Sequence, residues 1–301
     1  MGDLPVIIVN YNVREHLSDC LQSVLVSEGI RPSVTVVDNA SNDDSVAMVR
    51  SRFPLVNVLA SNVNGGFAYA NNLGLRQVDR DHPDIDDPPY VLILNPDTQV
   101  PPQGLADLVR FLDSHPEAAV VGPKLVRADG SLDLACRRSF PTPAVSLYRL
   151  SGLSRFFPHS RRFARYNLTY LDPDQTAEVD SVAGACMLVR RAVIAAVGGF
   201  DERFFMYGED LDWSLRMKER GWKVYYYPAV IVRHLKGESS RRSATRATQA
   251  FYESMLLFYR KHYAASTSPV LDRLIVGAIH LRGWWAGLRN RLRPEELRRV
   301  G

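Results

Sequence analysis

The chain has 301 residues, of which 46% are hydrophobic and 23% are charged, and its formal net charge is +4. These values exclude a disordered or fibrous protein and are typical of a globular one. Three cysteines are too few and too widely spaced for a disulfide framework or a zinc knuckle, so we expect a reduced, cytoplasmic protein with the cysteines in its core. No run of about 18 apolar residues occurs, and residues 1–9 are too short and uncharged for a secretory signal, so we expect no membrane-spanning helix.

The first 125 residues alternate between short apolar runs and segments in which apolar residues have helical spacing. The apolar runs, which we interpret as buried strands, are residues 4–9, 33–37, 56–59 and 90–94. The helical segments are residues 16–27, 44–53 and 67–77. This alternation predicts an α/β fold with a mostly parallel central sheet and helices on both faces. In such sheets ligands bind beyond the carboxyl ends of the strands, which is where this chain has its polar clusters.

The pattern changes after Val121. Strands are predicted at residues 123–138, 179–189 and 223–232, with an irregular stretch rich in arginine and aromatic residues at 140–170. A helix is predicted from about Asp210, and two further helices at residues 245–263 and 269–293. We therefore expect a single domain with a C-terminal helical extension.

Three polar residues follow predicted strands. Asp97 stands in Asn95-Pro96-Asp97, where a carboxylate can meet a metal–diphosphate; ordinary turn chemistry is the alternative. Asp38 ends the second strand, where a carboxylate can accept hydrogen bonds from a base or a ribose; capping of the next helix is the alternative. His234 ends the last strand, and its imidazole suits Mn²⁺ or other borderline metals, unless it is only a polar loop residue.

A glycine- and asparagine-rich stretch follows the third strand. It runs Asn64-Gly65-Gly66-Phe67 and continues with Asn71-Asn72-Leu73-Gly74. Glycines let the backbone approach a ligand closely, and a helix that begins here offers free N–H groups to a phosphate. The stretch is neither a Walker loop nor a dinucleotide GxGxxG motif. An ordinary tight turn is the alternative.

The stretch from Phe205 to Trp213 places three carboxylates, Glu209, Asp210 and Asp212, at the start of a predicted helix. The positive end of the helix dipole favours negative charge there, so helix capping accounts for one of them. Capping does not account for the aromatic residues on both sides, which suit a sugar ring. A carboxylate beside a bound sugar can deprotonate an acceptor hydroxyl.

The order of these pieces resembles one family, the inverting family 2 glycosyltransferases with the A-type, nucleotide-binding fold. The motifs that carry the resemblance are, in chain order, VIIVNYN, VVDNAS, NVNGGFAYANNLG, LILNPDT, GGFDERFFMYGEDLDWSLRMKERGW and HLKGES. Together they span residues 4–240, which is most of the chain. NPD followed by FFMYGEDLDWSLR is similar to the rhamnosyltransferase-type subgroup, whose members typically use dTDP-L-rhamnose to build bacterial cell-surface polysaccharide or its linkers.

The resemblance implies a role for each matched residue. Asp210 matches the catalytic base, and Glu209 would support it or contact the acceptor. Asp97 matches the metal-binding carboxylate of the DxD motif, and His234 would complete a site for Mn²⁺ or Mg²⁺. Asn95 replaces the first Asp of that motif, so the metal has one carboxylate fewer. The resemblance also implies a nucleotide pocket lined by Val9, Tyr11, Asn12, Asp38, Asn64, Gly65, Gly66, Asn71, Asn95 and Asp97.

The implied activity is transfer of a sugar with inversion, best matched by L-rhamnose from dTDP-L-rhamnose, to a hydroxyl of a glycan or polyprenyl-linked acceptor. The implied organisation is a catalytic domain at 1–240, with a nucleotide-binding part at 1–122 and an acceptor-binding part at 123–240, followed by basic helices at 241–301. A transferase that uses a UDP- or GDP-sugar and an inactive nucleotide-binding module are the alternatives. Residues 4–13 lack the glycine-rich loop of nucleotidyltransferases, and no nucleic-acid motif is present, so we expect no nucleic-acid partner.

The C-terminal segment is strongly basic, with 13 Lys and Arg against 5 Asp and Glu in residues 236–301. The predicted helix at 269–293 places Trp284 and Trp285 among arginines, a pattern typical of helices that lie in a membrane interface. This indicates peripheral attachment at the inner face of the plasma membrane. Packing on the catalytic domain or in a homodimer is the alternative. The arginine-rich stretch at 155–165 suits an acceptor phosphate, a mobile loop or a solvated surface, and the sequence does not choose among them.

Overall fold

The computed structural model describes residues 2–235 and 244–292. Residues 1, 236–243 and 293–301 lie outside the described part of the chain. Three of the expectations fall there: the end of the HLKGES motif, the domain boundary at 240/241, and the last basic residues.

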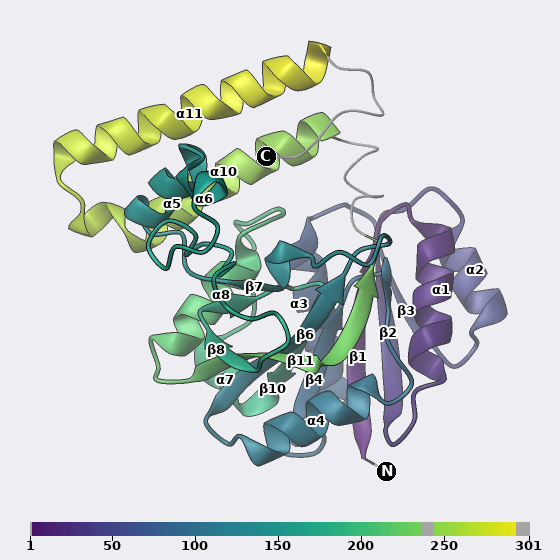
Figure 1. Cartoon of the computed structure of the whole chain (residues 1–301). Helices are drawn as coiled ribbons and strands as arrows, with labels where there is room; N and C mark the ends of the chain where they lie inside the picture. Colours follow the sequence, from purple (N-terminus) through teal and green to yellow (C-terminus); the bar gives the residue numbers. More distant parts are fainter. Residues whose placement is uncertain (1, 236–243, 293–301) are drawn as a thin grey trace.

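A nine-stranded sheet forms the centre of the described structure (Figure 1). Its strands have the order β3-β2-β1-β4-β10-β6-β11-β5, and β8 lies beside β11. The bounds are β1 (Asp3–Asn10), β2 (Arg31–Asn39), β3 (Asn57–Ser61), β4 (Tyr90–Leu94), β5 (Thr98–Gln99), β6 (Ala118–Val126), β8 (Ala177–Val179), β10 (Cys186–Arg190) and β11 (Lys223–His234). Strand β10 is antiparallel to both β4 and β6, so β1, β2, β3, β4, β6 and β11 share one direction. The sheet is thus mostly parallel, as predicted.

Strands β1 and β4 are buried on both faces, which explains their uninterrupted apolar runs. The strand expected to be buried at 56–59 corresponds to β3, which lies at the edge of the sheet and is only partly buried. Helices pack on both faces (Figure 1). They include α1 (Arg14–Leu25), α2 (Ser45–Arg52), α3 (Phe67–Asp81), α4 (Gly104–Ser114) and α7 (Arg191–Val197). Cys20, Cys136 and Cys186 are free and buried, as predicted.

The predicted elements of residues 4–94 are all present, with ends that differ by a few residues. Helix α4 is absent from the predicted elements, although Leu105, Leu108 and Leu112 have helical spacing and are buried.

The predictions for residues 123–189 were wrong in detail. The strand expected at 123–138 ends at Val126, because Asp129 and Gly130 form a turn in which Gly130 has φ +79°. The chain then forms a 3₁₀ turn, η1 (Leu134–Cys136), and β7 (Arg137–Arg138), which pairs with β9 (Ser181–Val182) in a separate two-stranded sheet. The strand expected at 179–189 is accordingly divided into β8, β9 and β10.

The stretch expected to be irregular, 140–170, contains two short helices, α5 (Pro143–Leu150) and α6 (Leu153–Phe156). Thr142 caps α5 by accepting a hydrogen bond from the backbone N–H of Val145, and Pro143 occupies the first helical position. Capping chemistry, not apolar spacing, was the available signal for α5.

The C-terminal residues form a helical hairpin of α10 (Ala244–His262) and α11 (Pro269–Leu292), which lies beyond one end of the sheet (Figure 1). The side-chain amide of Asn290 donates a buried hydrogen bond of 2.9 Å to the hydroxyl of Thr248 and so joins the two helices. Neither of them, nor any other described helix, is long and apolar enough to cross a membrane. The helix α8 (Glu209–Lys218) lies between the sheet and this hairpin and carries the predicted base.

Candidate active site

The carboxyl ends of β1 and β2 are joined by the buried side chain of Asp38. Its Oδ1 accepts a hydrogen bond from the amide of Asn10 at 2.8 Å, and its Oδ2 accepts one from the backbone N–H of Ser41 at 2.9 Å. The hydroxyl of Ser41 in turn accepts from the backbone N–H of Asn12 at 3.0 Å. Asp38 therefore shapes the loop at this edge of the sheet; its contact with a base stays a prediction. Val9 is buried below this loop, and Tyr11 is half-buried in it.

The next asparagine, Asn39, holds the glycine-rich turn. Its amide donates to Asn64 Oδ1 at 3.0 Å and to the carbonyl of Gly66 at 3.2 Å, and its Oδ1 accepts from the N–H of Gly65 at 3.0 Å. Gly66 has φ +91°, and a Cβ there would lie 2.3 Å from the carbonyl oxygen of Phe205. Only glycine fits this contact, which brings the turn against the segment before α8.

The two asparagines at the start of α3 have different environments. Asn72 accepts from the N–H of Phe200 and donates to its carbonyl, both at 2.9 Å, so it fastens α3 to the segment that precedes α8. Asn71 donates to the carbonyl of Phe67 at 2.9 Å, while its buried Oδ1 has no hydrogen-bond partner in the described chain. An unpaired buried oxygen is costly, so Asn71 is the better candidate for a ligand contact.

Asp97 and His234, which the resemblance assigns to one metal site, lie side by side at the end of β4; metal binding by them stays a prediction. The imidazole Nε2 of His234 lies 3.4 Å from Asp97 Oδ1, and its Nδ1 lies 3.2 Å from Asp133 Oδ2. All three side chains are buried. Burial lowers the pKa of His234, but the two carboxylates, Asp133 first, outweigh it and raise the pKa to about 9.

The Asp97–His234 pair fits one divalent cation with few protein ligands. An octahedral ion with bonds of about 2.1 Å places neighbouring ligand atoms about 3 Å apart, close to the separation of this pair. Asp133 holds the far nitrogen of the ring, the usual outer-shell arrangement of a metal-bound histidine. The described residues contain no group of three or more His, Cys, Asp or Glu arranged for a metal, so a diphosphate and water would have to complete the shell. Nearby, the buried Oδ1 of Asn95 has no hydrogen-bond partner in the residues described.

Asp210 lies at the start of α8, held by groups from three segments. Arg138 of β7 forms an ion pair of 2.5 Å with its Oδ2. The same oxygen accepts from the backbone N–H of Gly184 at 3.1 Å, and Oδ1 accepts from the N–H of Leu211 at 2.8 Å. These donors stabilise the carboxylate and fix its direction.

Glu209, the neighbour of Asp210, is held as a neutral acid. Burial, followed by the negative charge of Asp210, raises the pKa of Glu209 to about 8. Its Oε2 has no hydrogen-bond partner within the described structure. The raised pKa of Glu209 is the kind of perturbation that marks acid and base groups in active sites.

The backbone before this pair is strained. Tyr207 has φ +71° and Gly208 has φ +83°, so two consecutive residues occupy the left-handed region directly before Glu209. A bulky residue in this region is uncommon and costs of order 1–3 kcal/mol. Such strain concentrates at functional sites, which agrees with the predicted role of this turn.

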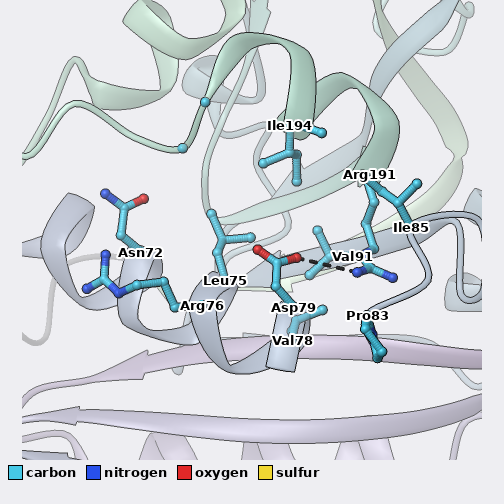
Figure 2. A pocket seen from close by; sticks show the side chains of 13 residues that line it. Asn72, Leu75, Arg76, Val78, Asp79, Pro83, Ile85, Val91, Arg191 and Ile194 are labelled. Atoms are coloured by element: carbon cyan, nitrogen blue, oxygen red, sulfur yellow. Dashed lines mark hydrogen bonds and ion pairs between the residues drawn. The ribbon is translucent and has the colours of Figure 1, made fainter. Parts of the chain in front are cut away.

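A separate cavity of about 490 Å³ lies between α3, α7 and the segment before β4 (Figure 2). Of the stretches predicted from the sequence to line the nucleotide pocket, only Asn72, next to Asn71, is part of the cavity lining. The guanidinium of Arg191 at its wall is engaged by the carbonyls of His82, Asp84 and Pro88, so it fastens a loop. We assign the chemistry to the sheet edge and not to this cavity.

Two residues of the site were missed by sequence reasoning, Arg138 and Asp133. Arg138 fell within a predicted strand, and Asp133 lay in the same stretch, so neither stood out by spacing or by motif. Each is recognisable only from its partner across the fold, Asp210 in one case and His234 in the other.

The fold is that of the A-type glycosyltransferases: a mostly parallel sheet carries acidic residues at its carboxyl edge, and a nearby helix begins with a pair of carboxylates. The solved structure of the mannosyltransferase PcManGT from Pyrobaculum calidifontis, in complex with GDP-Man and Mn²⁺, aligns with a TM-score of 0.57 and 18% identity over 95% of this chain and 72% of its own. TarS of S. aureus, residues 1–349 in complex with UDP, aligns with a TM-score of 0.53 and 16% identity over 95% and 72% of the two chains.

Sequence comparison gives the family. The profile of the family described as "Glycosyltransferase like family 2" matches residues 2–252. The N-acetylglucosaminyl-diphospho-decaprenol L-rhamnosyltransferase of Mycobacterium tuberculosis is 30% identical over 302 residues, which cover 99% of this chain and 96% of that protein. The rhamnosyltransferase WbbL of Escherichia coli is 28% identical over 183 residues, or 60% of this chain and 65% of WbbL. The chain belongs to glycosyltransferase family 2, and it is a glycosyltransferase.

The raised pKa of Glu209 makes a prediction about stability. Because the folded-state pKa of about 8 exceeds the ordinary value of 4.5, the folded protein keeps a proton that the unfolded chain loses between these pH values. This group therefore lowers the free energy of unfolding as pH rises from 4.5 to 8. Glu209→Gln removes that pH dependence. We therefore expect the free energy of unfolding of the variant, relative to that of the natural protein, to be higher at pH 8 than at pH 5 by at least about 1 kcal/mol. Urea unfolding of both proteins at pH 5 and pH 8 measures this change. If the difference in unfolding free energy between the two proteins is the same at both pH values, Glu209 is ionised in the folded protein.

Proposed function

We propose that the protein transfers a sugar from a nucleotide-sugar to an acceptor hydroxyl with inversion, using a divalent metal and Asp210 as general base. The observation that carries the proposal is the buried, oriented carboxylate of Asp210 beside a neutral Glu209 at the sheet edge. The ion pair with Arg138 and the two backbone donors fix the direction of the Asp210 carboxyl group, and its Oδ1 retains a second acceptor direction for a hydroxyl proton.

The residues divide the chemistry between two sides of the site. Asp97 and His234 would hold Mn²⁺ or Mg²⁺, with Asp133 orienting the histidine. When bound, the metal neutralises charge that develops on the leaving diphosphate. Asp210 accepts the proton of the acceptor hydroxyl as its oxygen attacks the anomeric carbon from the face opposite the diphosphate, which inverts the configuration. Glu209, as a neutral acid, donates a hydrogen bond to the acceptor.

The donor we propose is dTDP-L-rhamnose, and the acceptor is a glycan or a polyprenyl-linked sugar. Two relatives named as rhamnosyltransferases support the sugar, and the one from M. tuberculosis is named for a decaprenol-linked acceptor. We place the nucleotide on residues 1–122, on the loops of Asp38 and Asn64–Gly66, and the acceptor on residues 123–240, which supply Arg138 and Asp210. The C-terminal helices form a third part of the protein, after the nucleotide-binding and acceptor-binding parts.

We further propose that α11 lies on an anionic membrane surface at the inner face of the plasma membrane. Its side chains Leu274, Leu281, Trp284 and Trp285 are 58–64% exposed, and Arg282 and Arg289 are exposed beside them. Apolar and aromatic residues mixed with arginines suit the interface of a bilayer. The arginine-rich segment at 149–165, which has no acidic residue, contributes to the same surface, because Arg282 donates a hydrogen bond of 2.6 Å to the carbonyl of Leu150.

The base assignment is tested by Asp210→Asn. We expect kcat for sugar transfer to fall about 10²- to 10⁴-fold, because general base catalysis contributes on that scale, with little change in donor binding. The matched control is Glu219→Gln, which neutralises an exposed carboxylate at the other end of α8 and leaves kcat unchanged. Steady-state kinetics of both folded variants decide the matter; Asp210→Asn with natural kcat would overturn the assignment.

The donor and the metal are tested by thermal shift with dTDP-, UDP- and GDP-sugars, each with Mn²⁺, with Mg²⁺ and with chelator. A ligand that binds only the folded state raises the melting temperature. We expect a metal-dependent rise with dTDP-L-rhamnose, and loss of the metal dependence in Asp97→Asn and His234→Ala. A rise with UDP- or GDP-sugars alone would keep the transferase and discard rhamnose. No rise with any nucleotide would favour an inactive module.

The membrane contact is tested by sedimentation with vesicles of phosphatidylglycerol and phosphatidylcholine. We expect the natural protein to bind anionic vesicles and to be released by salt, because the arginines contribute through screened charge. The double change Trp284→Ser and Trp285→Ser should reduce binding about tenfold. The control, Leu55→Ser, changes a side chain that is 93% exposed elsewhere on the molecule and should have no effect. Equal binding by both variants would contradict the proposal.

A further inference from the structure

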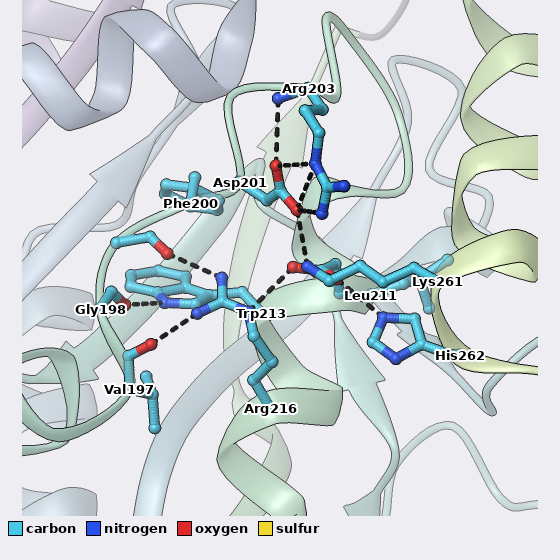
Figure 3. Close-up of polar contacts among 12 residues, drawn as sticks. Val197, Gly198, Phe200, Asp201, Arg203, Leu211, Trp213, Arg216, Lys261 and His262 are labelled. Atoms are coloured by element: carbon cyan, nitrogen blue, oxygen red, sulfur yellow. Dashed lines mark hydrogen bonds and ion pairs between the residues drawn. The ribbon is translucent and has the colours of Figure 1, made fainter.

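We propose that Lys261 and His262, at the end of α10, are positioning residues for the catalytic base: they hold Asp212 and through it the first turn of α8. The proposal rests on the proposed role of Asp210. It adds two residues from the C-terminal hairpin, outside every motif of the resemblance, to the machinery of transfer. Figure 3 shows Lys261 reaching from α10 toward Asp201 and α8, with His262 beside it.

The centre of this contact is the carboxylate of Asp212, which is fully buried at 0% exposure. Its Oδ1 lies 2.6 Å from Lys261 Nζ and 2.8 Å from His262 Nε2, and its Oδ2 lies 2.9 Å from Arg216 Nε. A buried carboxylate is costly unless it is paired and hydrogen-bonded. Two of its three side-chain partners come from α10, so the fold depends on α10 to keep this charge inside.

Lys261 also bridges two segments of the catalytic domain. Its Nζ lies 2.6 Å from Asp201 Oδ2 as well as from Asp212, and Asp201 is paired with Arg203 at 2.6 Å. These pairs pull down the pKa of Asp201, with Arg203 the larger cause, so the carboxylate stays charged. One ammonium group therefore fixes the distance between the loop before the base and the helix that carries it.

Helix α10 contacts the same turn at two further points. The hydroxyl of Ser254 donates a hydrogen bond of 2.9 Å to the carbonyl of Met206, directly before the strained residues. Phe258 packs with Phe204 and Leu211 in a small apolar cluster of its own. The turn that precedes Glu209 and Asp210 is thus attached to α10 on both sides of the base.

The position of Asp212 explains why these contacts matter for catalysis and not only for stability. Asp212 lies two residues after Asp210 in the first turn of α8, and the two share a rigid helical backbone. A shift of this turn moves Asp210 relative to Gly184 and Arg138, its partners on other segments. A misplacement of about 1 Å in a reacting group costs about 10²-fold in rate.

The pairing also differs from what stability alone requires. Replacing a buried charge pair by apolar groups often leaves the stability of a protein unchanged or raises it. An ionic contact is therefore not the most stabilising way to pack α10 on α8. A charged pair has one preferred geometry, whereas an apolar contact tolerates sliding. The contact of Lys261 with two carboxylates sets a defined position for the turn.

The test compares Lys261→Met, Lys261→Arg and His262→Phe with the natural protein. Methionine keeps the length of the lysine without its charge, and phenylalanine keeps the ring that packs against Phe258 at 4.7 Å without its N–H. We expect Lys261→Met and His262→Phe to lower kcat about 10- to 100-fold, with KM for the nucleotide-sugar unchanged within about twofold, and Lys261→Arg to restore most of kcat. Assays are run well below the melting temperature of each variant.

The matched control is Arg260→Met, which removes the adjacent cation of α10. Arg260 pairs with Asp272 of α11 at 2.7 Å and makes no contact with α8 among the interactions described, so kcat should stay unchanged. A double-mutant cycle of Lys261→Met with Asp212→Asn identifies the route. If Lys261 acts through Asp212, the double variant loses no more of kcat than the worse single variant.

The outcomes separate this proposal from the assignment of the base. Loss of kcat in Asp210→Asn together with natural kcat in folded Lys261→Met and His262→Phe would refute the positioning role and leave the base in place. Parallel loss of kcat and of donor binding would show a structural role only and would also refute it. Natural kcat in Asp210→Asn would overturn the base and, with it, the positioning role. If Lys261→Met does not fold, His262→Phe and Lys261→Arg decide by the same criteria.

Discussion

Strand β10 is the constraint on which the site depends. It runs antiparallel between β4 and β6, and so joins the first, parallel half of the sheet to the second. The residues just before it contact both sides of the site: the carbonyl of Ala185 accepts from the N–H of Asn95, and the N–H of Gly184 donates to Asp210. One short backbone segment therefore sets the spacing between the proposed metal side and the proposed base. A Cβ on residue 184 would approach the ring of Phe67 at 3.4 Å, so the segment is also closely packed.

The site uses the same residue type in three ways, and its surroundings decide which. Asp38 is enclosed by amide and backbone donors and shapes a loop. Asp97 faces an imidazole and suits a cation. Asp210 faces an arginine and two backbone N–H groups and suits a proton acceptor, while Glu209 next to it keeps a proton. The differences in the proposed roles follow from burial and from the nearest opposite charge, which is the general cause of divided roles among carboxylates.

The C-terminal hairpin has two faces with different chemistry. Toward the catalytic domain, α10 presents the ammonium of Lys261, the imidazole of His262 and the ring of Phe258. Away from it, α11 presents exposed tryptophans and arginines. If both proposals hold, the same element binds the surface that carries a lipid-linked acceptor and fixes the base that deprotonates it. Contact with the membrane would then act on the position of the base through α10.

The sequence alone determined the order of strands and helices over residues 4–94 and the family. Strands buried on both faces require continuous apolar runs, and helices require a local spacing, so both are visible in a short window. It also placed Asp97, His234 and Asp210 at element ends, where the topology gathers polar residues. It did not show that the strands expected at 123–138 and 179–189 are interrupted near Gly130 and Gly184. One long strand and two short strands joined by a turn have similar apolar content, so the local pattern does not distinguish them.

Only the tertiary structure decided the pairings that give these residues their chemistry. Arg138 meets Asp210 across 72 residues, Asp133 meets His234 across 101, and His262 meets Asp212 across 50. No local pattern encodes such pairs, since the partners are brought together by strand order and helix packing, which depend on the burial of the whole core. The sequence therefore supplied the carboxylates and the histidine, and the fold supplied the partners that charge, orient and position them.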